Sequence, residues 1–225
     1  MQKNINWQEF EDNYSLQSEV VKTIINLSSE SIKENGVFKV IFSGGSTPEK
    51  IYNLLSQDNF INFKKWEIYI GDERCLDSEN HDRNSQMIAR SLLRELPDDN
   101  SPTFFPIEAE KGSIQAALSY NKVISKVDYF DLVLLGLGED GHTASLFPDH
   151  NFDTNEHVIP VSNAPKPPSD RVSLTPTAFN KGKKIMFIVT GNGKSDAVVK
   201  WKTGHDIPAS KIRSDNLIDI FINLK

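Results

Sequence analysis

The feature that most constrains the fold of this chain is a repeated succession of short apolar runs and glycine-rich loops. Four runs are apolar and rich in β-forming residues: VFKVIF (37–42), WEIYI (66–70), DLVLLGLG (131–138) and KIMFIVTG (184–191). Each run ends in a loop of glycine and polar residues, and a helical pattern follows three of the four loops. Such alternation is typical of a parallel sheet covered by helices. We therefore expect an α/β fold with three layers, α/β/α, and a mostly parallel, doubly wound sheet.

Further elements surround these four units. Apolar side chains recur at helical spacing from Ser15 to Asn35, and Gly36 follows as a helix C-cap, so a helix is expected to open the domain. Additional strands are expected at HVIPV (157–161), RVSLT (171–175) and LIDIFIN (217–223), the last at an edge of the sheet. SNAPKPPSD (162–170) favours an extended surface loop, too short to divide domains. The 225 residues contain no repeat and are expected to form a single domain, 1–225.

Charge and cysteine content exclude several classes of function. The formal charge of −6 argues against a protein that binds nucleic acid or an anionic membrane, while an anionic small molecule would require a local basic pocket. The single cysteine, Cys75, excludes an intrachain disulfide and a cysteine cluster for zinc. The first residues lack a secretory signal pattern, and no run approaches the ~20 apolar residues that span a bilayer. We expect a cytoplasmic protein.

The residues that could bind a ligand or take part in a reaction lie in the loops after the strands. Ligands of open α/β sheets bind at the carboxyl ends of the strands, where such loops converge. In SGGSTP, Gly44 and Gly45 allow close backbone approach, and the next helix directs free N–H groups at an anion, so a phosphate is expected beside Ser43, Ser46 and Thr47. The alternative is an ordinary turn in which glycine relieves strain and a hydroxyl caps the helix.

The segment GLGEDGHTASLFP matches a dinucleotide-binding pattern at Gly136, Gly138 and Gly141, but Pro148 follows too soon for the long helix which that motif requires. What the segment offers is His142, which titrates near neutrality and has two acidic neighbours, Glu139 and Asp140. This side chain could act as a general base. The alternative is that it caps a helix.

Three cations are candidates for a basic pocket. GNGKS resembles a Walker A loop, but the required first glycine would fall at Ile188, so we exclude that motif. Lys194 nevertheless stands where a helix begins, and a bound anion would relieve its conflict with the helix dipole. Arg74 can bind phosphate or carboxylate with its guanidinium fork, unless it pairs with Asp72 or Glu73, and Arg171 is a weaker candidate for the same pocket. The other histidines lack zinc-site spacing, and we interpret them as surface groups: His81, His150, His157 and His205.

With these residues in view, the chain resembles the 6-phosphogluconolactonase family, which shares its fold with glucosamine-6-phosphate deaminases and related isomerases. The matching segments, in the family's order, are SGGSTP, GDER followed by HDRNSQMI, GLGEDGHTASLFP, and RVSLT leading to VTGNGKSDAV. The resemblance implies a hydrolase of the oxidative pentose phosphate pathway that opens the lactone ring of 6-phosphogluconolactone. It implies no cofactor and no metal, and a monomer or a small homo-oligomer.

The resemblance also assigns roles. The resemblance implies that His142 activates water, that Ser43, Gly44, Gly45, Ser46 and Thr47 form the phosphate-side loop, that Arg74 and Lys194 are substrate-binding cations, and that Asn84 lies near the site. From the residues themselves we expect Asp140 to assist His142, Asp72, Gly141 and Arg171 to bind substrate, and backbone N–H groups of residues 136–142 to meet the oxyanion. The deaminase branch carries a glutamate at the position of Phe147 and reads DEY where this chain reads DER. One departure is that LIDIFINLK lacks a tryptophan-containing strand seen in many lactonases. Two rivals stay open: a deaminase or isomerase of amino-sugar phosphates, and a non-catalytic sugar-phosphate sensor.

Overall fold

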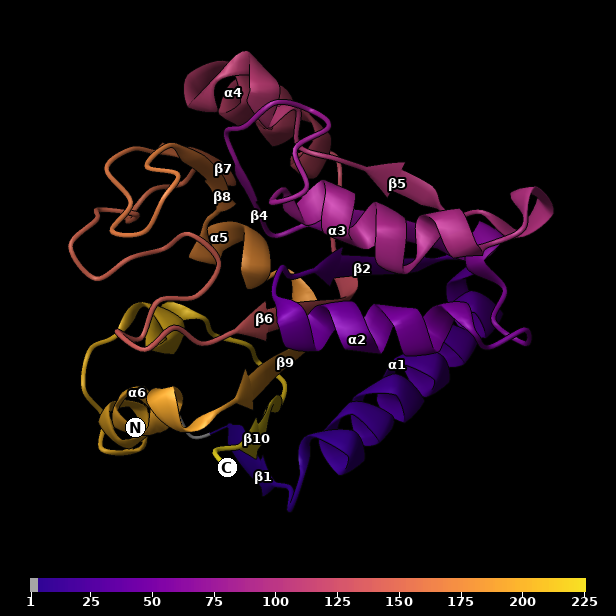
Figure 1. Ribbon diagram of the computed structural model, residues 1–225, viewed down its shortest axis with the longest axis horizontal. Helices are drawn as coiled ribbons and strands as arrows, with labels where there is room; N and C mark the ends of the chain where they lie inside the picture. The colour runs from indigo at the N-terminus through magenta and orange to yellow at the C-terminus, as the bar shows by residue number, and fades with distance from the viewer. Residues whose placement is uncertain (1–3) are drawn as a thin grey trace.

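The computed structural model describes residues 4–225, which fold around a seven-stranded sheet (Figure 1). All neighbouring strands are parallel. In spatial order they are β1 (Ile5–Glu9), β10 (Ile218–Asn223), β9 (Gly182–Thr190), β6 (Phe130–Gly136), β2 (Phe38–Phe42), β3 (Trp66–Ile70) and β5 (Thr103–Phe105). Flanking helices bury the inner strands, which explains their near-continuous apolar sequences. The predicted fold class is confirmed.

The order of the strands creates a crevice between β2 and β6. From β2 the chain proceeds outward through β3 to β5, then returns to place β6 beside β2 and continues in the opposite direction through β9 and β10. The connections that leave β2 and β6 therefore diverge. In parallel α/β sheets this reversal opens a binding crevice at the carboxyl ends of the two strands.

The helices are α1 (Asn13–Asn35), α2 (Ser46–Ser56), α3 (Asn84–Ser91), α4 (Ser113–Ile124), α5 (Pro176–Phe179) and α6 (Ser195–Lys202), with short 3₁₀ turns η1 (Phe63–Lys65), η2 (Leu93–Glu95), η3 (Asp98–Asn100), η4 (Ala109–Lys111), η5 (Asn192–Lys194) and η6 (Pro208–Lys211). The helices α1, α2, α3 and α6 occur where the sequence pattern predicted helices, whereas α4 and α5 were not predicted. The Asp12 carboxylate accepts the Ser15 amide at 2.7 Å and starts α1, and Gly36, at φ 77°, ends it. Helices α1, α2 and α3 lie side by side (Figure 1).

A second, three-stranded sheet stands beside the first. It joins β4 (Asp72–Arg74), β8 (Arg171–Leu174) and β7 (Val158–Val161) in antiparallel order. The sequence predicted β7 and β8 as strands but not their separate sheet. Its consequence is that Arg74 and Arg171 become direct cross-strand partners although they are far apart in the chain.

Three sequence-based expectations were wrong. A strand, β1, precedes the first helix, so α1 does not open the fold; its short, half-exposed sequence gave no clear alternation. Because β1 pairs with the outer side of β10, the LIDIFIN strand is not at the edge. After WEIYI and GDER the sequence pattern predicts a helix through Met87 to Leu96; that helix ends at Ser91, since Leu92 leaves helical geometry at φ −136°.

The boundary of the predicted single domain at residue 1 lies outside the described residues. Within residues 4–225 no helix is both long and apolar enough to cross a membrane.

Candidate active site

A cleft of about 370 Å³ lies at the carboxyl ends of β2 and β6, in the crevice that the strand order creates. We call it the rim cleft. The loops after β2 and β6, the start of α6 and the second sheet all contribute to it. Nine of the predicted site residues line it: Ser43, Gly44, Gly45, Asp72, Arg74, Asn84, His142, Arg171 and Lys194. Ser46, Thr47, Asp140 and Gly141 are not on its lining.

The SGGSTP loop connects β2 to α2 and is shaped by its glycines. A Cβ on Gly44 would lie 2.0 Å from Oδ1 of Asn84, so only glycine allows this approach, and Gly45 adopts φ +115°. Ser43 is 8% exposed, and its buried hydroxyl has no hydrogen-bond partner among the described residues. Thr47 Oγ1 is 2.7 Å from Thr190 Oγ1, so this hydroxyl ties α2 to the end of β9.

His142 lies in the loop after β6, held by its neighbour Asp140. The Asp140 carboxylate is 2.5 Å from Nδ1 of His142 and also accepts the His142 amide at 3.0 Å. Burial raises the pKa of Asp140, but the hydrogen bonds and charge interaction with His142 outweigh it and leave this pKa below its usual value. The aspartate therefore acts on the imidazole from outside the rim cleft and fixes the orientation of the ring.

Two glycines allow this loop to form. A Cβ on Gly138 would lie 2.0 Å from Nδ1 of His142. Gly141, at φ +91°, packs so closely on Ile207 that a Cβ would come within 2.8 Å of that side chain. Gly141 therefore holds the loop against Ile207, and its predicted role in substrate binding stays a prediction.

Phe147 provides an apolar wall for the imidazole. It is buried, and its ring centroid is 4.8 Å from that of His142. The Arg171 guanidinium lies over the same ring at 5.6 Å. Where the deaminase branch has a carboxylate, this chain therefore places an aromatic face, and Asp140 is the acid that contacts the histidine.

Asp72 is the one carboxylate on the lining of the rim cleft. It is 7% exposed, and it accepts hydrogen bonds from Oγ of Ser145 at 2.6 Å and from Nδ2 of Asn84 at 3.1 Å. Neighbouring Glu73 is fully buried and faces away: it accepts the amides of Asn84 and Ser85, at 2.7 and 2.8 Å, and so caps α3.

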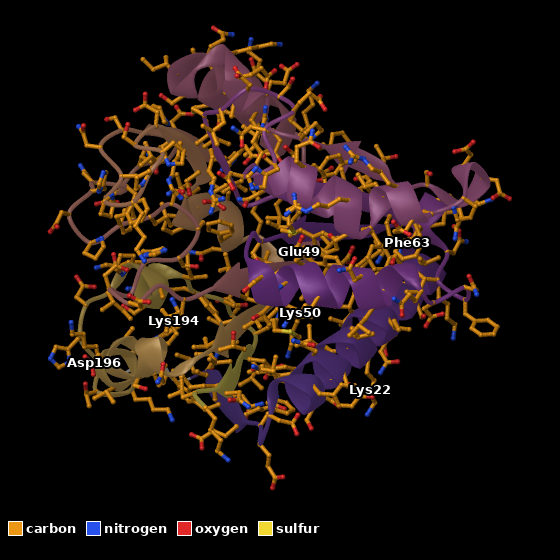
Figure 2. The ribbon with its side chains drawn as sticks, viewed as in Figure 1. Lys22, Glu49, Lys50, Phe63, Lys194 and Asp196 are labelled. Carbon is orange, nitrogen blue, oxygen red and sulfur yellow. The ribbon has the colours of Figure 1, made fainter. Side chains whose placement is uncertain are left out.

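Four cations line the rim cleft together with this single carboxylate: Arg74, Lys166, Arg171 and Lys194. The local basic pocket that an anionic ligand would require is thus present within an acidic chain. Arg74 pairs with neither Asp72 nor Glu73 in the described part of the chain; its Nη1 donates to the Asp82 carbonyl at 2.5 Å. Lys194 stands at the start of α6 (Figure 2) and forms no ion pair with residues 4–225.

Arg171 performs a second task. Its guanidinium donates to the carbonyls of Pro168 at 3.1 Å and Lys166 at 2.9 Å, which fastens the loop 162–170 against the rim cleft. Burial lowers the pKa of Arg171, Asp72 opposes that shift, and Arg74 adds to it. Sequence reasoning treated this loop as surface and missed Lys166; a lysine among three prolines was the available signal.

The remaining histidines lie away from the rim cleft. His81 and His205 are exposed, as expected. His150 and His157 are only partly exposed, and each has a buried Nδ1 without a hydrogen-bond partner among residues 4–225, so their interpretation as plain surface groups was wrong. Burial lowers the pKa of His157.

Comparison with known proteins connects this geometry to one family. Residues 11–220 match the family model described as glucosamine-6-phosphate isomerases/6-phosphogluconolactonase. A probable 6-phosphogluconolactonase of Schizosaccharomyces pombe is 37% identical over 84% of this chain and 81% of its own length, and 6-phosphogluconolactonase 3 of Saccharomyces cerevisiae is 31% identical over 83% and 80%. The crystal structure of 6-phosphogluconolactonase from Thermotoga maritima has the same fold, with a TM-score of 0.87 at 24% identity, over 96% of this chain and 98% of that one.

Proposed function

Because the chain belongs to the glucosamine-6-phosphate isomerase/6-phosphogluconolactonase family, we propose that it hydrolyses 6-phosphogluconolactone to 6-phosphogluconate. The observation that carries this choice is His142, held by Asp140 on one side and by the Phe147 ring on the other, at the mouth of a basic cleft. Such a site has a general base and anion-binding groups, which suffice for an ester that is already activated.

In the proposed reaction His142 takes a proton from water as the oxygen attacks the lactone carbonyl. The tetrahedral intermediate then collapses, the C–O bond to the ring oxygen breaks, and that oxygen receives the proton from His142. Asp140 accepts a hydrogen bond from Nδ1–H of His142, which leaves Nε2 free to exchange protons with water and the leaving oxygen. The net change is addition of one water molecule.

In this proposal the cations of the rim cleft stabilise the negative charge of the tetrahedral intermediate. The amides of Gly138 and Gly141 bond within the loop to the carbonyls of His142 and Gly138, and the His142 amide bonds to Asp140. These three N–H groups are therefore engaged within the loop, which leaves fewer loop amides for the oxyanion. Lys194 and Arg74 supply the compensating charge, and the SGGSTP loop with the N-terminus of α2 receives the phosphate.

Phe147 is the proposed determinant against amino-sugar chemistry. A deaminase-type reaction uses a second acid beside the histidine, and an aromatic ring at this position can neither donate nor accept a proton. The sensor alternative is disfavoured because Asp140 fixes the imidazole at short range, an arrangement that binding alone does not require.

The proposal also covers the cellular location and the oligomeric state of the enzyme. The only cysteine, Cys75, is a free thiol, and burial raises its pKa to about 11, so it stays protonated at neutral pH. We propose a cytoplasmic enzyme with a phosphorylated sugar lactone as substrate. Light scattering after size exclusion tests whether it is a monomer or a small homo-oligomer.

The first experiment measures hydrolysis of freshly generated 6-phosphogluconolactone, coupled to a dehydrogenase that consumes 6-phosphogluconate. We expect turnover well above spontaneous ring opening, and a loss of about 10²–10⁴-fold in kcat for His142→Ala because a general base contributes that much. Circular dichroism of the variant checks that it folds.

Two outcomes would contradict the proposal. A rate no higher than the spontaneous opening would favour the sensor, and release of ammonia from glucosamine 6-phosphate would favour the deaminase. Full activity of the His142→Ala enzyme would leave the reaction standing but remove the role of this side chain.

A further inference from the structure

The loop 162–170 contributes a lysine to the rim cleft that the proposed reaction does not use. Lys166 lies on the lining of the cleft, as His142 does. Its side chain is exposed, and it forms neither a hydrogen bond nor an ion pair with any residue from 4 to 225. An unpaired cation on the wall of a cleft for an anionic ligand is available to bind that ligand.

The backbone that carries this lysine is restrained. Arg171, which is 8% exposed, donates from Nη2 to the Lys166 carbonyl at 2.9 Å and from Nε to the Pro168 carbonyl at 3.1 Å. The Ala164 amide donates to the Ser169 carbonyl at 2.9 Å and closes the loop. A proline on each side of the lysine further restricts the chain. The loop therefore presents the lysine from a fixed position.

The loop 162–170 is also attached to the part of the site that holds His142. The Nε2 atom of His150 lies 2.8 Å from the Ser162 carbonyl oxygen, and since that oxygen can only accept, Nε2 carries the proton. The His150 ring packs on Phe147, with centroids 5.6 Å apart, and the Phe147 ring lies 4.8 Å from that of His142. The Arg171 guanidinium lies over the same ring. The loop thus enters the rim cleft at the His142 end.

Lys194 enters the rim cleft from the other end. It follows Thr190, whose Oγ1 is 2.7 Å from Oγ1 of Thr47 in the SGGSTP loop, the loop proposed to receive the phosphate. The other two cations, Arg74 and Arg171, donate to carbonyls of the chain. The two lysines are therefore the cations of the cleft whose side chains have no partner in the described part of the chain, and they stand at opposite ends.

We propose that Lys166 binds the lactone end of the substrate. Its ammonium group pairs with the negative charge that develops on the carbonyl oxygen and that remains on the carboxylate of the product. This inference rests on the proposed function, which places the carbonyl at His142. Because the amides of Gly138, Gly141 and His142 are engaged within their loop, a cation from the facing loop supplies charge there. Arg171 is then a positioning residue that acts through the loop 162–170.

A matched pair of ligands tests which end of the substrate Lys166 meets. 6-Phosphogluconate has a carboxylate where glucitol 6-phosphate has a hydroxymethyl group, and the rest of the two molecules is the same. In calorimetry Lys166→Ala should weaken binding of 6-phosphogluconate about fivefold and leave that of glucitol 6-phosphate unchanged. An equal loss for both ligands would place the lysine at the phosphate, and no loss for either would remove it from the site. Both results would overturn the proposal.

Kinetics test the same charge during the reaction. Lys166→Ala should lower kcat about 10-fold and raise KM less than about threefold, because the oxygen is more negative in the transition state than in the substrate. Lys166→Arg keeps the charge and should retain about a third of kcat or more. The control is Lys22→Ala, an exposed lysine on α1 (Figure 2), which should match the wild type. A rise in KM alone, or the same loss in the control, would overturn the proposal.

A double-mutant cycle tests the positioning role of Arg171. Arg171→Lys keeps the positive charge but removes the guanidinium fork that donates to the loop carbonyls. We expect it to lower kcat about fivefold in the wild-type background and less than about 1.5-fold in the Lys166→Ala background, where no lysine remains to be positioned. Circular dichroism checks folding. Losses that multiply would mean that the two residues act independently, which would overturn the positioning role.

The wild-type enzyme separates this inference from the proposed function. No hydrolysis of the lactone by the wild type would contradict the proposed function itself. Hydrolysis by the wild type at a rate that Lys166→Ala leaves unchanged would contradict this inference alone. The calorimetric comparison of the two ligands needs no catalysis and tests the contact of Lys166 with the carboxylate directly.

Discussion

At the scale of single residues, the candidate site depends on glycines as much as on ionisable groups. Gly44 admits the Asn84 amide, Gly138 admits the His142 ring, and Gly141 accommodates Ile207. In each case a side chain occupies the space where a Cβ would stand. The glycine pattern in GLGEDGH, which suggested a dinucleotide fingerprint, serves to place one histidine.

Replacing Gly138 with alanine should displace the imidazole, because the new Cβ would lie 2.0 Å from Nδ1. We expect kcat to fall about 10²-fold or more, since small misplacements of catalytic groups have effects of that size. The matched control is Gly136→Ala, where a Cβ meets nothing within 4 Å. Steady-state kinetics measure kcat of both variants. An equal loss of kcat in the two variants would mean that crowding at His142 is not the cause.

The pKa of Asp140 predicts a dependence of stability on pH. Its folded-state pKa is lowered by the bonds to His142, so its contribution to stability is full above the unfolded value of about 3.9 and is lost as pH falls through the folded pKa. Thermal midpoints of the wild type and of Asp140→Asn should differ near pH 6, and the difference should shrink as the pH falls below the unfolded value and through the folded pKa. A constant difference over that interval would show that Asp140 acts without its charge.

At the scale of elements, Glu73 connects β4, α3 and the site. Its buried carboxylate accepts the amides of Arg74, Asn84 and Ser85, and it lies 3.5 Å from Nε of Arg83, which is 3% exposed. The side chains of Asp72 and Arg74 face the rim cleft on either side of it, as the alternation along a strand requires.

Glu73→Ala should therefore destabilise the fold by about 3–5 kcal/mol, because it leaves three amides without their acceptor and removes one of the two carboxylates beside the buried Arg83, which keeps Glu110. Urea unfolding measures the change. The comparison variant is Glu49→Ala, which removes a part-exposed ion pair with Arg90 at 2.8 Å and should cost at most about 1 kcal/mol. Similar costs for the two variants would contradict the capping role.

At the scale of the whole molecule, an acidic chain concentrates its positive charge in a few places. The rim cleft is lined by four cations, Arg74, Lys166, Arg171 and Lys194, and by one carboxylate, Asp72. With a total charge of −6, an anionic substrate is attracted only where these local fields exceed the average repulsion.

Salt should therefore weaken the apparent affinity for a phosphorylated lactone. Raising ionic strength from about 0.01 M to 0.15 M shortens the Debye length from about 30 to 8 Å, and we expect KM to rise several-fold with little change in kcat. A lactone without phosphate serves as the control and should show a high KM that salt does not alter. A salt effect of the same size on both substrates would mean that salt acts on the enzyme and not on its attraction for the phosphate group.

The sequence by itself determined the layered α/β class, the loops that carry function and the family, because hydrophobic periodicity, glycine spacing and long motifs are local. The tertiary structure decided what depends on distant contacts. It placed β1 outside β10, made Arg74 and Arg171 neighbours in a second sheet, engaged the amides of Gly138, Gly141 and His142 within their loop, and brought Lys166 to the cleft. None of these is encoded in spacing along the chain, because each is fixed by pairing and packing between segments far apart in sequence.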